Sequence, residues 1–171
     1  MTRWFATASA LALACGLSAG AASAAPSSVY TAIQKCPAAR LQLPGLTLER
    51  GVHLCKGAGG YSVYVVSESD RSWLALRREG RLFPLQEHMT VRFEAGHFPN
   101  VDGGKVVEWR VSATGAPVAL IARIAYQDRD DAFKSGSTLI VYDLVSADAP
   151  TFLGYFATNE AARAAADALA R

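Results

Sequence analysis

Apolar residues recur at every second position along much of the chain, which is the period of a half-buried β-strand rather than of a helix. Turn-forming residues interrupt these runs at short intervals, as in Asp102-Gly103-Gly104 and Ala113-Thr114-Gly115-Ala116. The pattern therefore predicts a mainly antiparallel β-sheet. We expect its strands at residues 52–55, 61–67, 72–77, 89–94, 105–112, 117–127, 138–145 and 151–156.

The three longest consecutive strands allow their pairing to be predicted as well. If tight hairpins centred near residues 114 and 133 join them, the turn positions fix the register. Trp109 then lies beside Leu120 on an apolar face. On the opposite face, Arg123 lies across from Asp143.

This opposite face also carries apolar residues such as Ile121 and Val141, so another element must cover it. Residues 159–170 are rich in alanine and predict a helix that Thr158 or Asn159 can cap. The fold class is therefore α+β, a mainly antiparallel β-sheet with a C-terminal Ala-rich helix packed on it. A half-closed barrel plugged by the helix is the alternative.

The N-terminal residues have the order of charge, apolar run and small residues that is typical of a secretory signal. Arg3 precedes an apolar run over residues 4–17, and Ala22-Ser23-Ala24 supplies the cleavage motif. We expect a signal peptide at residues 1–24, and export of residues 25–171 as a single β-rich domain that is periplasmic or secreted. The run is too short and too rich in Ala and Gly to span a membrane, and no later stretch qualifies.

Cys15 allows a second interpretation of the same segment. Ala12-Leu13-Ala14-Cys15 is similar to a lipoprotein processing site, although Ala stands where such sites usually have Leu. Processing there would leave a lipid-bearing Cys15 as the mature N-terminus, and the protein would be anchored to a membrane.

The charge of the mature chain is nearly balanced. The whole chain has 17 Lys and Arg against 15 Asp and Glu, and removal of the signal peptide deletes one basic residue, Arg3. A nucleic-acid binder needs a clustered basic surface to neutralise phosphates, so this balance argues against one.

Signal cleavage would also leave two cysteines, Cys36 and Cys55, in a compartment that oxidises thiols. Two cysteines in an exported chain are most simply partners, so we expect a disulfide between them. A reactive thiol is the alternative.

The stretch CKGAGGYSVYVV combines Cys55 with a glycine-rich loop. A phosphate-binding loop leads into a helix, whereas here the following residues are β-branched and aromatic and predict a strand. The glycines are expected to turn the chain sharply. Lys56 and Tyr61 remain candidate functional residues on a turn formed by Gly57, Gly59 and Gly60.

Polar residues on the strands form a candidate recognition patch. It consists of Glu108, Arg110, Arg123 and Asp143. Cross-strand ion pairs of this kind are more often structural. The patch can bind a ligand only if the C-terminal helix leaves it open.

No sequence motif points to catalysis or to a metal. There is no G-x-S-x-G motif, and the three histidines lack the spacing of a metal site, although acidic residues stand near His88 and His97. The acidic run Asp128-Arg129-Asp130-Asp131 lacks the Gly and Glu of an EF-hand loop. We therefore expect no catalytic residues, no metal and no cofactor.

The motif Cys55-Lys56-Gly57-x-Gly59-Gly60-Tyr61, followed by Glu108-Trp109-Arg110, resembles an uncharacterised family of small exported proteobacterial proteins. That resemblance implies export but brings no activity with it. In size, export, disulfide and β-rich class, the chain is also similar to periplasmic lysozyme inhibitors, but it lacks their Ser-Gly-x-x-Tyr type signature.

These observations lead to the expectation of a periplasmic, non-catalytic binding module whose partner is an unknown envelope protein or small ligand. An envelope structural or stress-related protein, lipid-anchored through Cys15, is the alternative. An enzyme with an unrecognised site is the second alternative.

Overall fold

Antiparallel strands and one C-terminal helix make up the described part of the computed structural model, which covers residues 25–49, 51–146 and 148–170. The expected signal peptide and Cys15 lie outside the described residues. The strands are β1 (Ser27–Ala32), β2 (Leu41–Leu43), β3 (Leu46–Leu48), β4 (Val52–Lys56), β5 (Ser62–Glu68), β6 (Arg71–Arg78), β7 (Arg81–Pro84), β8 (His97–Asn100), β9 (Val106–Val111), β10 (Pro117–Gln127), β11 (Ser135–Asp143) and β12 (Thr151–Phe156). None of the helices in these residues is long and apolar enough to cross a membrane.

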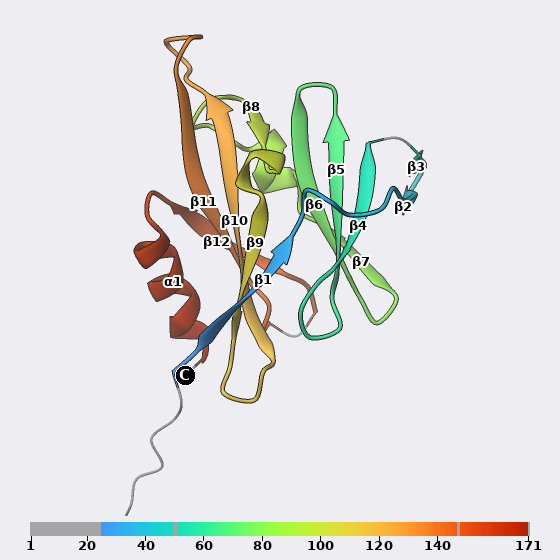
Figure 1. Ribbon diagram of the computed structural model, residues 1–171, viewed down its shortest axis with the longest axis vertical. Helices are drawn as coiled ribbons and strands as arrows, with labels where there is room; N and C mark the ends of the chain where they lie inside the picture. The colour runs from blue at the N-terminus through green and yellow to red at the C-terminus, as the bar shows by residue number, and fades with distance from the viewer. Residues whose placement is uncertain (1–24, 50, 147, 171) are drawn as a thin grey trace, which may run out of the picture.

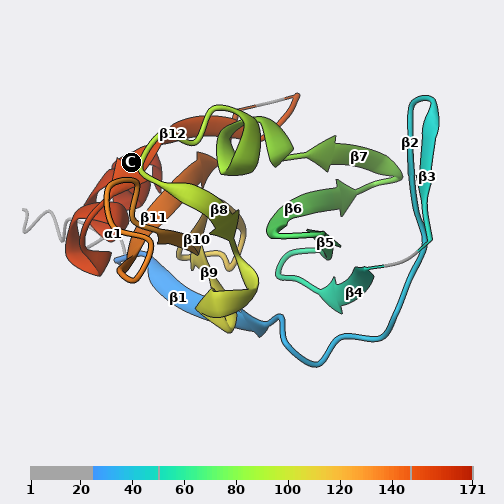
Figure 2. The same ribbon diagram turned by 90° about the horizontal axis from the view of Figure 1, so that it is seen from above.

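The strands form two main sheets and a small hairpin (Figure 1). One sheet has the order β1-β9-β10-β11-β12, with β8 pairing beside β10, and the other is the meander β4-β5-β6-β7. Figure 2 shows the layers, with the C-terminal helix outside the larger sheet and the β2–β3 hairpin beyond the smaller one. The α+β prediction is confirmed, and the half-closed barrel is wrong because the strands form separate sheets.

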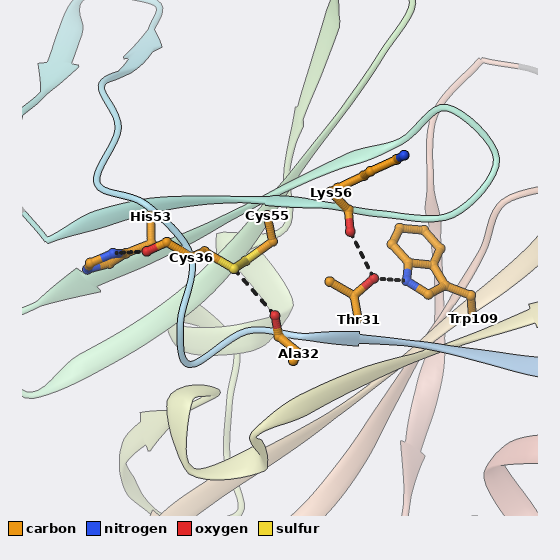
Figure 3. Close-up of a disulfide and its surroundings, with 7 residues drawn as sticks. All are labelled: Thr31, Ala32, Cys36, His53, Cys55, Lys56 and Trp109. Atoms are coloured by element: carbon orange, nitrogen blue, oxygen red, sulfur yellow. Dashed lines mark hydrogen bonds between the residues drawn. A yellow bond between two sulfur atoms is a disulfide. The ribbon is translucent and has the colours of Figure 1, made fainter.

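The main hydrophobic core lies between the two large sheets, because alternate residues of each strand point to the same side. Trp109 on β9 is fully buried there, and its Nε1 donates to Thr31 Oγ1 of β1 at 2.9 Å. The Thr31 hydroxyl in turn donates to the carbonyl oxygen of Lys56 at the end of β4 (Figure 3). One buried threonine therefore ties both sheets to the central tryptophan.

Cys36 and Cys55 form a disulfide, as the sequence predicts. Cys55 is buried on β4, and Cys36 lies in the segment that leads from β1 to β2 (Figure 3). His53 Nδ1 lies 2.9 Å from the carbonyl oxygen of Cys36. The same segment makes an isolated bridge to the outer edge of β4. The disulfide therefore holds the connecting segment against the smaller sheet.

The helix α1 (Asn159–Asp167) continues as a 3-10 turn, η3 (Ala168–Ala170), and packs on the face of the larger sheet that points away from the core. The hydroxyl oxygen of Thr158 accepts from the N–H of Ala161 at 3.2 Å and caps the helix. Ala162 and Ala166 are fully buried against the sheet. The predicted helix and its packing are confirmed.

The predicted register is confirmed on one side of β10 and wrong on the other. Trp109 pairs with Leu120, as expected. Arg123, however, pairs with Leu139, four residues before Asp143 on β11. The loop runs from Asp128 to Lys134, since the carboxylate of Asp128 accepts from the N–H groups of the next two aspartates. This moves the hairpin centre away from residue 133.

One predicted strand is wrong. The π-helical turn η1 (Glu87–Val91) and the loop after it take the place of a strand at 89–94. Met89 and Phe93 are both buried and stand four positions apart, which matches a helical turn as well as an alternating strand. A second short turn, η2 (Asp102–Gly104), links β8 to β9.

Candidate functional site

The glycine-rich turn between β4 and β5 is packed against the body of the protein. Gly59 and Gly60 have left-handed backbones, with φ of +54° and +82°. A Cβ on Gly59 would lie 2.2 Å from Cδ of Pro117, and one on Gly57 would lie 2.7 Å from the ring of Trp109. Gly57 and Gly59 are required by this close approach, and Gly60 by its left-handed backbone, so the glycines serve the turn and its packing.

The two candidate side chains of this turn lie apart from each other. Tyr61 is buried, and its ring lies 5.5 Å from that of Trp109 between centroids. The guanidinium of Arg78 lies over the Tyr61 ring, 5.2 Å from its centroid, and its hydrogen bond with Tyr61 raises the pKa of Arg78. Lys56 is exposed. Tyr61 therefore serves packing against Trp109.

Glu108 and Arg110 of the expected recognition patch are buried beneath α1. Arg110 donates from Nε and Nη2 to the two carboxylate oxygens of Asp167, at 2.7 and 2.8 Å. Arg163 donates in the same forked way to Glu108, at 2.7 and 3.0 Å, and this contact raises the pKa of Arg163. Both pairs fasten the helix to β9, so the two patch residues serve the packing of α1, although Glu108 also lines a small pocket beside Arg123.

The other two patch residues are separated from each other. Asp143 ends β11, where its carboxylate accepts from the N–H of Val145 at 2.6 Å and from the hydroxyl of Ser146. Arg123 is half-buried near the start of α1 and donates to Ser137 Oγ at 3.0 Å and Asn159 Oδ1 at 3.2 Å. The expected Arg123–Asp143 pair is therefore wrong, because the register pairs Arg123 with Leu139, four positions before Asp143 on β11.

An apolar hollow lies at the far end of the larger sheet, and none of the four patch residues lines it. It measures about 610 Å³ and lies beside the tip of the β10–β11 hairpin, which projects at the top of Figure 1. Ala125 and Gln127 of β10 line it, together with Phe98 of β8 and Phe133 of the hairpin loop. This volume is within the range of ligand pockets in proteins.

Phe98 owes its orientation to a bulge in β8. Asn100 pairs with Ala125 and His97 with Gln127, so two residues of β8 stand opposite one residue of β10. Phe98 lies inside this bulge with φ of +54°, a left-handed backbone that is strained for a bulky side chain. Bulges of this kind redirect a side chain, and here the ring is left half exposed at the hollow.

Phe133 is fully exposed on the hairpin loop. The loop around it is held by its own hydrogen bonds, from Asp128 N–H to the Lys134 carbonyl oxygen and from Lys134 N–H to the Asp131 carbonyl oxygen, both 2.9 Å. The carboxylate of Asp131 accepts from the N–H of Phe133 at 3.0 Å and pairs with Lys134. These contacts lower the pKa of Asp131 below its ordinary value of 3.8. The exposed phenylalanine therefore stands on a preorganised turn.

The hollow offers apolar surface with polar groups beside it. Its walls are mostly apolar, and Gln127 and Lys134 supply polar groups at the rim. Gln127 itself donates to the carbonyl oxygen of Ala132 at 2.6 Å and so braces the loop. Within residues 25–49, 51–146 and 148–170, no cluster of three or more metal-ligating side chains is found.

Sequence reasoning missed this hollow, although one signal was present. Phe133 is a large apolar residue in an otherwise polar hairpin loop, where a packed core cannot be reached. The bulge at Phe98 has no comparable signal in the sequence, and β8 itself was not predicted.

The chain matches no family model, no curated protein and no solved structure. The resemblance of the CKGxGGY and EWR motifs to an uncharacterised family implies no activity for this chain.

Proposed function

We propose that this protein is an exported, non-catalytic binding module that docks an apolar side chain of a partner protein in the hollow between Phe98 and Phe133. One observation carries the proposal: two large aromatic side chains are held in solvent, one by a strained bulge and the other by a preorganised loop. Strain and exposed aromatic surface both cost stability, and recognition sites are where proteins retain them.

A protein partner suits the hollow better than an enclosed small molecule does. The hollow is wide and open, whereas a small-molecule pocket buries most of its ligand's surface. Aromatic residues that are already rigid lose little entropy on binding, and they commonly anchor protein interfaces. Phe133 on its ordered loop has the properties of such an anchor.

Export to the periplasm is part of the proposal. The N-terminal sequence has the order of a cleavable signal, and the Cys36–Cys55 disulfide is compatible with an oxidising compartment. The partner is accordingly an envelope or secreted protein.

Site-specific photo-crosslinking tests this function. A benzophenone amino acid is placed at position 133 and, as a matched control, at Leu46, an exposed apolar residue of the β2–β3 hairpin. Irradiation in the native envelope is expected to give one defined adduct from position 133 and none from position 46. The adduct is identified by mass spectrometry, and the purified partner must then bind the unlabelled protein.

Equal adducts from both positions, or no binding by the purified partner, would count against the proposed function. A partner that binds equally well after Phe133→Ser would do so too, because the anchor would then contribute nothing.

A further inference from the structure

A second, smaller pocket adjoins the hollow along β10. It measures about 240 Å³, and its polar lining consists of Arg123, Asn159, Arg163, Tyr30 and the carboxylate of Glu108. Residues two apart on a strand share a face and lie roughly 7 Å apart, so Arg123 precedes Ala125 of the hollow on the same side of β10. The turn η2 borders both spaces, since Gly103 lines the hollow and Gly104 the pocket.

Positive charge is in excess around this pocket. The neighbouring guanidinium groups of Arg110 and Arg163 are each matched by a carboxylate, Asp167 and Glu108. Arg123 bonds only neutral groups, and no carboxylate of the described residues lies within 4.0 Å of its guanidinium. Glu160, in the first turn of α1, is exposed and does not line the pocket. The surplus cation is therefore Arg123.

Around Arg123, the pocket has further hydrogen-bond donors, and its one carboxylate, Glu108, is already paired with Arg163. Glu108 accepts from Arg163 with both carboxylate oxygens. Tyr30 accepts from Arg163 at 2.9 Å, which leaves the tyrosine O–H proton to donate. Asn159 accepts from Arg123 through Oδ1, which leaves its amide N–H groups. A cation surrounded by spare donors suits a carboxylate or another oxyanion.

From this juxtaposition we infer that the pocket and the hollow form one site for the C-terminal end of the partner polypeptide. The terminal carboxylate binds Arg123, and the apolar side chain of the last residue enters the hollow beside Phe98 and Phe133. This inference rests on the proposed function and names the part of the partner that binds. Capture of a chain terminus through its carboxylate is a recurrent mode of peptide recognition.

The geometry favours a peptide end over a fatty acid. A long acyl chain needs a deep apolar tunnel, whereas this hollow is wide and bordered by polar side chains. Asn159 and Gln127 belong to the two adjoining spaces, so amide groups line the path between the carboxylate and the hollow.

A titration followed by two-dimensional NMR tests the inference with defined probes. N-acetyl-phenylalanine represents a C-terminal residue, and N-acetyl-phenylalaninamide has the same side chain without the charge. The acid is expected to shift the Arg123 and Asn159 side-chain signals in a saturable way, and to bind about tenfold or more tightly than the amide. Octanoate serves as the fatty-acid probe, and chloride holds the ionic strength constant.

Two variants locate the binding. Arg123→Gln is expected to remove the preference for the acid over the amide. Asn159→Asp adds a carboxylate beside Arg123 at the first helical position, where an acidic residue suits the helix dipole, so the fold is kept while the acid is repelled. Arg71→Gln on the exposed end of β6 is the matched control and is expected to change nothing.

The outcomes separate this inference from the proposed function. Equal binding of acid and amide that is lost on Phe133→Ser would retain the docking function and overturn the C-terminal carboxylate. Binding of octanoate without N-acetyl-phenylalanine would replace the peptide by a fatty acid and overturn the inference. No saturable shift with the acid, or an acid preference that survives both Arg123→Gln and Asn159→Asp, would also overturn it.

Discussion

Gly59 and Gly60 share a left-handed backbone but differ in their surroundings. A Cβ at Gly60 would meet nothing within 4 Å, whereas one at Gly59 would lie 2.2 Å from Pro117. Gly60→Ala is therefore expected to cost about 1 kcal/mol of unfolding free energy, for the backbone alone. Gly59→Ala is expected to cost roughly 1–3 kcal/mol more because of the added clash. Urea denaturation of both variants measures the difference, and equal losses would contradict the packed turn.

The pKa of Asp131 provides a second test at the level of one residue. Its carboxylate accepts hydrogen bonds from Lys134 and from the N–H of Phe133, which lowers its pKa below 3.8. Because the pKa is lower in the folded protein, the ionised carboxylate stabilises the loop at pH values above the pKa of the unfolded chain. This stabilisation is lost as the pH falls through the pKa of the folded protein. The Phe133 amide signal is therefore expected to titrate with a midpoint below 3.8.

Asp131→Asn serves as the control for this titration. It removes the titrating carboxylate, so the Phe133 amide is expected to lose its pH-dependent shift while signals elsewhere keep theirs. A Phe133 midpoint at or above 3.8 in the unaltered protein would mean that the loop is not held as described.

Among the elements, α1 depends most on its polar contacts with the larger sheet. The Arg110 guanidinium is almost fully buried and is neutralised by the forked contact from Asp167. Asp167→Asn keeps the shape but leaves this buried charge poorly compensated, and is expected to cost roughly 2 kcal/mol of unfolding free energy.

Asp148→Asn is the matched control for this change, since Asp148 pairs with Arg81 at 3.9 Å with its side chain 94% exposed. It is expected to cost less than about 0.5 kcal/mol. Denaturant midpoints compare the two variants, and similar losses would show that the helix is held by its alanines alone.

The elements differ in how far the sequence could predict them. The strands at 117–127 and 151–156 were predicted with the bounds they have. The first is a nearly continuous apolar run between two turns, and the second alternates between exposed and half-buried residues. The predicted strand at 89–94 was wrong because the spacing of Met89 and Phe93 fits a helical turn as well as an alternating strand. The β10–β11 register was wrong because side-chain hydrogen bonds of Asp128 and Asp131 set the loop, and a periodicity argument contains no such bonds.

At the scale of the whole molecule, the disulfide connects the segment after β1 to the smaller sheet. Cys36 and Cys55 are 19 residues apart, and a loop of this length stabilises a fold by roughly 3 kcal/mol. Replacing both cysteines with alanine is expected to lower the unfolding free energy by about that amount. Chemical denaturation with and without reductant measures it, and no change on reduction would show that the bridge does not constrain the unfolded chain.

The candidate site was harder to predict from the sequence than the fold was. Arg123 was singled out with Glu108 and Arg110 because all three share one face of the sheet, and the structure retains that face. The sequence could not tell which of them α1 would neutralise, because Arg163 and Asp167 reach the sheet only through the packing of the helix. The hollow depended on a bulge and on a loop, both set by local hydrogen bonding.

The most direct test of the account is the affinity of the purified, crosslink-identified partner for three forms of the protein. These are the unaltered chain, Phe133→Ser and Leu46→Ser. Truncating an interface anchor typically costs 2 kcal/mol or more, so Phe133→Ser is expected to weaken binding by roughly thirtyfold or more, while Leu46→Ser leaves it unchanged. Equal affinity of all three forms would contradict the claim that the aromatic hollow is the docking site.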